Sequence, residues 1–138
     1  KALPKAIFTG HLSGKELSKA VASMDLLITT GENETFCQVI QEAMAAGLAV
    51  VAPNAGGPKD LIIDGVDGFL YEPGENLDIR KKVLRTIFDR EQLNQMSAAA
   101  YSKVQGKTWD HVCNQLVEIF NEVLEDKRHN DEHGMQAS

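Results

Sequence analysis

Two glutamates, Glu34 and Glu42, lie eight positions apart in the segment ENETFCQVIQEAM. If both belong to one helix, their side chains lie roughly 80° apart around its axis and roughly 12 Å apart along it. Carboxylates accept hydrogen bonds from sugar hydroxyls, and the free N–H groups that begin a helix favour an anion such as a diphosphate. The residues Phe36, Cys37 and Gln38 would supply those N–H groups. The spacing therefore predicts a site for a ligand with hydroxyls at both ends and phosphates between them, as in a nucleotide sugar.

The sequence on either side of the glutamates predicts the elements that position them. A helix is expected over about residues 35–46, because Thr35 can cap its first N–H groups and Gly47 can take the left-handed conformation that ends it. Residues 48–52 form an apolar run without alternation, which favours a parallel strand buried on both faces. A second strand is expected at residues 26–29, and the loop that carries Glu34 follows its carboxyl end. Ligands of open α/β sheets bind beyond that end.

The remaining elements follow from periodicity and from turn residues. Ser13 and Glu16 have the spacing of a capping box, and Pro58 suits a first helical position. The paired glycines Gly56 and Gly57 are explained either by turn chemistry or by a close approach of the backbone to a ligand. Strands are expected at residues 6–9 and 69–71, turns at 64–68, and helices at 13–24, 58–63, 77–89, 90–106 and 109–126.

The segment ETFCQVIQEAMAAGLAVVAPNAGGP, with its Glu34-x7-Glu42 pattern, closely resembles the donor-binding signature of family 4 retaining glycosyltransferases. These are enzymes of the GT-B group, which transfer a hexose from a nucleotide sugar. The variant Glu-Thr-Phe-Cys-Gln, in which Cys37 stands where many members have glycine, looks most like bacterial members that use GDP-mannose. A UDP-sugar remains the alternative donor.

The resemblance implies a role for each matching residue. Glu34, with Thr35 beside it, would hold hydroxyls of the donor hexose at the catalytic centre, and Glu42 would accept from the ribose hydroxyls. The other donor-binding residues would be Phe36, Cys37 and Gln38 through their backbone amides, Val39 against the ribose, Gly10, His11 and Leu12 against the base, and Gly56 and Gly57 near the sugar. For His11 an exposed loop histidine without a ligand is the simpler interpretation.

The resemblance also implies the domain organisation. Family 4 enzymes have two Rossmann-like domains, and the likeness covers the second. Residues 1–126 are therefore expected to form an N-terminally truncated, three-layer α/β domain with a parallel sheet, and residues 127–138 a polar, disordered tail. The parent enzyme would supply the rest of the site. This comprises the partner domain, which would bind a glycan or lipid acceptor, and the Arg and Lys that neutralise the diphosphate. No cofactor and no metal are expected, although His129 and His133 have a spacing that can bind one.

Composition and net charge argue against several other classes of protein. The 138 residues are 43% hydrophobic and 25% charged, the profile of an ordinary globular domain, and the net charge of −6 argues against nucleic-acid binding. The apolar runs are too short to span a bilayer, and secretion is not expected, because the sequence shows no basic-then-apolar segment that ends in small residues. A cytoplasmic location is expected, compatible with peripheral association of the parent enzyme with the inner face of a membrane. Cys37 and Cys113 are expected to be buried, reduced thiols rather than a disulfide.

Two further functions compete with the glycosyltransferase interpretation. One is a non-catalytic module that binds nucleotide sugars on the same fold. The other is a cysteine-dependent enzyme, because a helix N-terminus would lower the pKa of the Cys37 thiol, although no partner histidine is evident.

Overall fold

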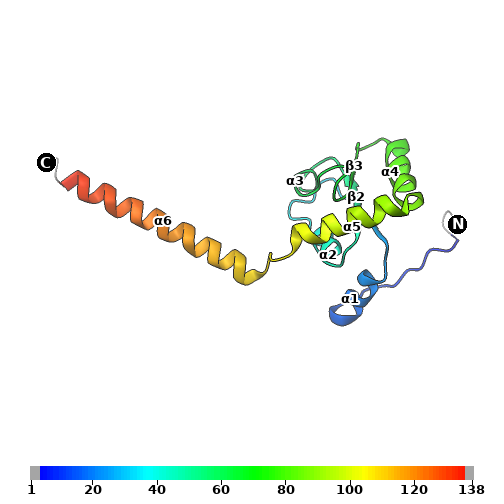
Figure 1. Ribbon diagram of the computed structural model, residues 1–138, viewed down its shortest axis with the longest axis horizontal. Coiled ribbons are helices and arrows are strands. Elements are labelled where there is room, and N and C mark those ends of the chain that lie inside the picture. Colours follow the sequence, from blue (N-terminus) through cyan, green and yellow to red (C-terminus); the bar gives the residue numbers. More distant parts are fainter. Residues whose placement is uncertain (1–3, 136–138) are drawn as a thin grey trace. The chain divides into compact units, whose positions relative to one another are not determined.

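The computed structural model describes the backbone of residues 4–135 and the side chains of residues 4–108 and 110–127. The chain divides into two compact units, Lys1–Val104 and Gln105–Ser138. The first unit holds the sheet and α1 to α5, and the second holds α6 (Figure 1). None of the described helices has an apolar stretch long enough to cross a membrane.

The sheet consists of three parallel strands, β1 (Leu26–Ile28), β2 (Ala49–Pro53) and β3 (Phe69–Tyr71), in the order β1-β2-β3. Every residue of the central strand β2 is buried, as its continuous apolar sequence predicts. Strand β3 lies at one edge of this sheet. The three predicted strands from residue 26 onward agree with the structure to within one residue at each end.

The side chains of β2 alternate between two hydrophobic clusters, one on each face of the sheet. Val50 and Ala52 pack in the cluster that includes α2, whereas Ala49 and Val51 pack in the cluster that includes Phe69. The helices are α1 (Gly14–Ala22), α2 (Gln38–Ala45), α3 (Pro58–Leu61), α4 (Asn76–Phe88), α5 (Arg90–Val104) and α6 (Trp109–Met135). Helices on both faces of a parallel sheet make the three-layer α/β architecture that the sequence predicts.

The turn from α2 into β2 has the geometry that Gly47 predicts. Gly47 has a φ of 78° and its N–H donates to the Met44 carbonyl at 3.0 Å, while Leu48 N–H donates to the Ala43 carbonyl at 3.0 Å. These two bonds form a Schellman motif, which satisfies the last carbonyls of the helix. The motif directs the chain from α2 straight into the buried strand.

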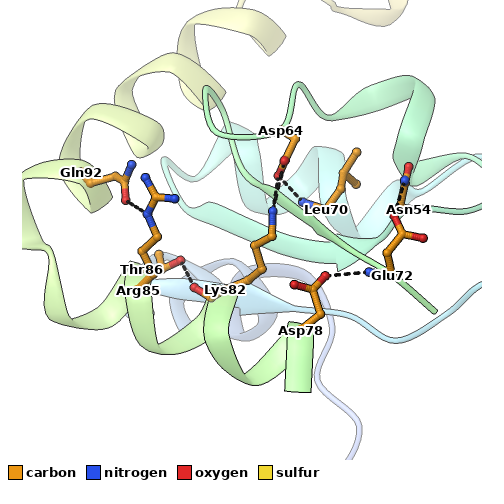
Figure 2. A network of polar contacts seen from close by, with 9 residues as sticks. All are labelled: Asn54, Asp64, Leu70, Glu72, Asp78, Lys82, Arg85, Thr86 and Gln92. Atoms are coloured by element: carbon orange, nitrogen blue, oxygen red, sulfur yellow. Dashed lines mark hydrogen bonds and ion pairs between the residues drawn. The ribbon is translucent and has the colours of Figure 1, made fainter. Parts of the chain in front are cut away.

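A polar network fixes the edge strand β3 to α4 (Figure 2). The Asp64 carboxylate accepts from Leu70 N–H at 2.8 Å and from Lys82 Nζ at 3.1 Å. The cations of Lys82 and Arg85 lie 5.0 and 5.1 Å from the centroid of the Phe69 ring. The charged groups therefore cover the buried Phe69 ring and protect the β3 edge of the sheet.

Two predictions near the N-terminus were wrong in detail. Residues 6–9 form no strand, and Ile7 and Phe8 are 88% and 91% exposed, because no neighbouring strand in the described part of the chain offers them a ladder. Ser13 does occupy the N-cap of α1, but its side chain makes no capping hydrogen bond.

The last helix is longer than predicted. It continues through residues 127–135, where the sequence predicted a disordered tail, because the lack of an apolar stripe does not end a helix and no proline interrupts it. Residues 136–138 lie outside the described part of the chain. The side chains of His129 and His133 lie outside the described residues, so their spacing as a metal site stays an untested expectation.

Candidate functional site

Helix α2 begins three residues later than the sequence predicts. Its N-cap is Cys37, which has a φ of 53°, and neither Thr35 nor Cys37 caps it through a side chain. The left-handed turn at Cys37 separates Glu34 from the helix. Because Glu34 lies in a loop, the helical estimate of its separation from Glu42 does not apply.

The start of α2 presents a row of unpaired backbone N–H groups. In the described part of the chain, the N–H groups of Phe36, Cys37, Gln38 and Val39 donate to no acceptor. The Cys37 carbonyl accepts from Gln41 N–H at 3.1 Å, and the Gln41 side chain donates to the Phe36 carbonyl at 2.8 Å. The carbonyls are thus satisfied while the donors stay available, which is the arrangement that favours an anion.

Gly57 supports the loop of residues 34–37, called here the 34–37 loop, from behind. Its N–H donates to the Glu34 carbonyl at 2.7 Å. A Cβ atom at Gly57 would lie 2.4 Å from the Thr35 carbonyl oxygen and 2.8 Å from Cys37 Sγ. Gly56, with a φ of 54°, approaches the Glu32 carbonyl in the same way. The paired glycines therefore have a packing reason within the chain, and the Gly57 N–H is already engaged.

A cavity of about 220 Å³ opens beside this support. It brings together four of the predicted site residues, which are Thr35, Phe36, Cys37 and Gly57. Gln41, Asp60 and Leu61 complete its lining, and the sequence analysis assigned no role to them. Gln41 could have been found as the residue one helical turn after Cys37, and Asp60 as the acid in the first turn after the paired glycines.

The two glutamates lie in different surroundings. The half-buried Glu34 side chain lies against Gly31, where an added Cβ would be 2.9 Å from Oε1 of Glu34. Glu42 is exposed and lines a groove of about 420 Å³ between α1 and α2, together with Leu17 and Val21. The structure therefore brings Glu34 to the start of α2 and Glu42 to the groove beside α1.

The loop of residues 10–12 lines neither the cavity nor the groove. Gly10 has a φ of 69°, His11 is exposed and Leu12 is half-buried. Neither space therefore supports the contact with the base that the resemblance implies for residues 10–12. The role of His11 remains a prediction.

The pKa of the Cys37 thiol is shifted in the opposite direction from the one predicted. Burial, together with the negative charges of Glu34 and Asp60, raises the pKa of the Cys37 thiol. The carboxylates and the loss of water outweigh the helix N-terminus, so the thiolate is disfavoured. Cys113 is a free, exposed thiol and not the buried one predicted. A cysteine-dependent reaction at Cys37 therefore loses its physical basis.

A parallel sheet covered by helices, with an amide-lined helix start at its carboxyl edge, defines a Rossmann-like domain of the GT-B glycosyltransferase fold. Residues 2–103 match the family described as glycosyl transferases group 1, and the chain belongs to this family.

Among its relatives is the GDP-mannose-dependent alpha-mannosyltransferase of Corynebacterium glutamicum, which is 43% identical over 122 residues. That match covers 88% of this chain and 30% of the relative, so the chain spans about a third of the length of the curated relatives it matches. The resemblance of the residue 34–58 segment to GDP-mannose-dependent members of the family is confirmed.

Two solved structures are also similar. Anabaena HepE, crystallised with UDP, superposes with a TM-score of 0.70 at 30% identity, over 79% of this chain and 30% of that chain. The C-terminal domain of the group 1 family protein LpcC from Francisella tularensis gives a TM-score of 0.65 at 28% identity, over 72% of this chain and 52% of that one. The predicted fold class is confirmed.

Proposed function

We propose that this chain is the donor-binding domain of a retaining glycosyltransferase that transfers mannose from GDP-mannose to a glycan or lipid acceptor. The observation that carries the proposal is the row of unpaired N–H groups at residues 36–39, with Glu34 beside it and Glu42 one to two turns along α2. The amides suit the diphosphate and the carboxylates suit hydroxyls of the hexose and the ribose.

The choice of mannose and guanine is supported by the relatives. A GDP-mannose-dependent enzyme is 43% identical to this chain, whereas HepE, which was crystallised with UDP, is 30% identical. The HepE structure favours a UDP-hexose as the alternative donor in the same site. The two donors share the diphosphate and ribose, so both would use the same amides and Glu42.

Within the intact enzyme, each part of the site would act on a different part of the donor. The amides and the positive end of the α2 dipole would hold the diphosphate and stabilise the charge that develops on it as the sugar leaves. Glu34 would fix the hexose through its hydroxyls next to the bond that breaks. No metal is required for these steps. Transfer itself would take place with the acceptor-binding remainder of the parent protein.

Ligand-observed NMR tests the proposal, because it detects weak binding. The chain is titrated with GDP-mannose, GDP, UDP-glucose and UDP, and the titration is repeated with Glu42→Ala and with Glu118→Ala, an exposed glutamate of α6, as a control. We expect signal transfer to GDP compounds that Glu42→Ala reduces and Glu118→Ala does not. A preference for UDP compounds would support the alternative donor.

Kinetics of the full-length parent enzyme test catalysis separately. Glu34→Ala and Glu42→Ala should each lower turnover or raise the KM for the donor, since each removes an acceptor for substrate hydroxyls. Unchanged kinetics in both variants would refute the proposed site. Retained nucleotide binding without transfer in the parent protein would favour the non-catalytic binding module.

A further inference from the structure

An ion pair between the buried Asp67 and the half-buried Lys103 joins the end of α5 to the segment that follows α3. Asp67 is 2% exposed, and its carboxylate accepts from Ile63 N–H at 2.8 Å and from Lys103 Nζ at 2.6 Å. The same ammonium donates to the carbonyl of Leu61, the last residue of α3. Lys103 therefore holds both the carboxyl end of α3 and the turn behind it.

Helix α3 depends on such anchors for its position. It has only four residues, and an isolated helix of that length is not stable in water. Its carboxyl end is held by Lys103, and the glycine before its first residue, Gly57, donates to the Glu34 carbonyl. Buried Pro58 and Ile62 fix its side against the core. Helix α3 is thus a short strut between the ion pair and the 34–37 loop.

The contact at the loop end of the strut leaves little free space. An added Cβ at Gly57 would lie 2.4, 2.8 and 3.0 Å from atoms of Thr35, Cys37 and Glu34. A small displacement of α3 must therefore move the 34–37 loop as well, because close-packed atoms transmit displacement. The same loop leads into the unpaired N–H groups at the start of α2.

We propose that Asp67 and Lys103 are positioning residues, which set the 34–37 loop for nucleotide binding through α3. The binding part of this inference rests on the proposed function. Removing the Lys103 ammonium leaves the Asp67 carboxylate buried without a cation, which is strongly unfavourable. The turn that holds Asp67 then opens toward water, the Leu61 carbonyl loses its donor, and the loop loses its fixed support.

The test compares Lys103→Met with Lys82→Met in the 138-residue chain labelled with ¹⁵N. Lys82 forms an ion pair of 3.1 Å with Asp64 on the β3 side, so its loss serves as a matched control (Figure 2). We expect Lys103→Met to shift the amide resonances of residues 34–38 and to weaken GDP binding about threefold to tenfold. Lys82→Met should lower stability while leaving these resonances and the affinity unchanged.

A double variant separates positioning from stability. Asp67→Asn combined with Lys103→Met removes the buried charge, so part of the stability lost in Lys103→Met returns, and the variant also serves if the single change prevents folding. Affinity should stay low, because the Leu61 carbonyl still lacks its ammonium donor. Recovery of affinity in parallel with stability, or unshifted 34–38 amides in Lys103→Met, would overturn the inference. If the wild-type chain binds no nucleotide, the proposed function fails and the amide shifts alone decide the positioning role.

Discussion

Replacing Gly57 by alanine should damage the site through sterics alone. Gly57 has φ −66° and ψ −32°, a helical conformation that alanine adopts without cost. The new Cβ, however, would lie 2.4 Å from the Thr35 carbonyl oxygen, whereas ordinary contact begins at 3.4 Å. The 34–37 loop must therefore move about 1 Å away from α3, taking the difference between these two distances.

The size of the effect follows from this displacement. Overpacking a close contact costs about 1–3 kcal/mol, and lengthening the 2.7 Å bond from Gly57 N–H to the Glu34 carbonyl costs about 1 kcal/mol more. Alanine offsets up to about 1 kcal/mol by restricting the unfolded chain. We expect a net loss of about 2 kcal/mol in the free energy of unfolding. A 1 Å shift also removes one or two charge-assisted hydrogen bonds to the diphosphate, which weakens binding by at least about tenfold.

Urea unfolding and an NMR titration with GDP measure the two effects in the same protein. The matched control is Gly74→Ala, at a glycine with a φ of 82° and no atom within 4 Å of the added Cβ. That change should cost about 1 kcal/mol through the left-handed backbone alone and leave affinity unchanged. The reasoning is refuted if Gly57→Ala keeps the wild-type affinity for GDP. It is also refuted if Gly57→Ala lowers the free energy of unfolding by no more than Gly74→Ala does.

Three more predictions follow, two on Cys37 and one on whether nucleotide binding needs a metal. Cys37→Val should lower the free energy of unfolding by about 1 kcal/mol in urea unfolding, because a β-branched residue resists the φ of 53° more than cysteine does; wild-type stability would contradict this. Because the folded pKa of the Cys37 thiol is raised, only the unfolded chain loses this proton as the pH passes about 8.5, so stability falls from there upward. Urea unfolding measures the free energy of unfolding at pH 7 and at pH 9.5. This free energy should fall less between the two pH values in Cys37→Ala than in Cys113→Ala, the exposed-thiol control. Equal falls would remove Cys37 as the cause. EDTA should leave GDP binding unchanged in the titration, since backbone amides hold the diphosphate, and loss of binding would show that a metal is needed.

The sequence predicts most of the first unit because its signals are local. The Gly47 stop, the apolar run of β2 and Pro58 at the first position of α3 each depend on a few neighbouring residues, and each was found where expected. The strand expected at residues 6–9 was wrong for the opposite reason. A strand requires a partner, and apolar residues alone cannot supply one.

The details of the candidate site depend on contacts between distant residues. Thr35 is a good capping residue in isolation, yet the helix begins after Cys37, where the left-handed turn fits against Gly57, which is 20 positions away in sequence. The ion pair between Asp67 and Lys103 joins residues 36 positions apart. Helical periodicity could not reveal either contact. The same contacts explain why the predicted spacing of Glu34 and Glu42 along one helix was wrong.

The charge balance of the site indicates what else the donor needs. The diphosphate of a nucleotide sugar carries about two negative charges, and a helix N-terminus offers about half a positive charge. No Lys or Arg lines the described cavity beside Cys37, and its one ionisable acid, Asp60, adds repulsion. The amides can therefore orient a diphosphate better than they can neutralise it. This imbalance predicts weak, strongly salt-dependent nucleotide binding by the chain alone, and it predicts that added cationic groups, supplied in the parent protein, raise affinity without changing the pose.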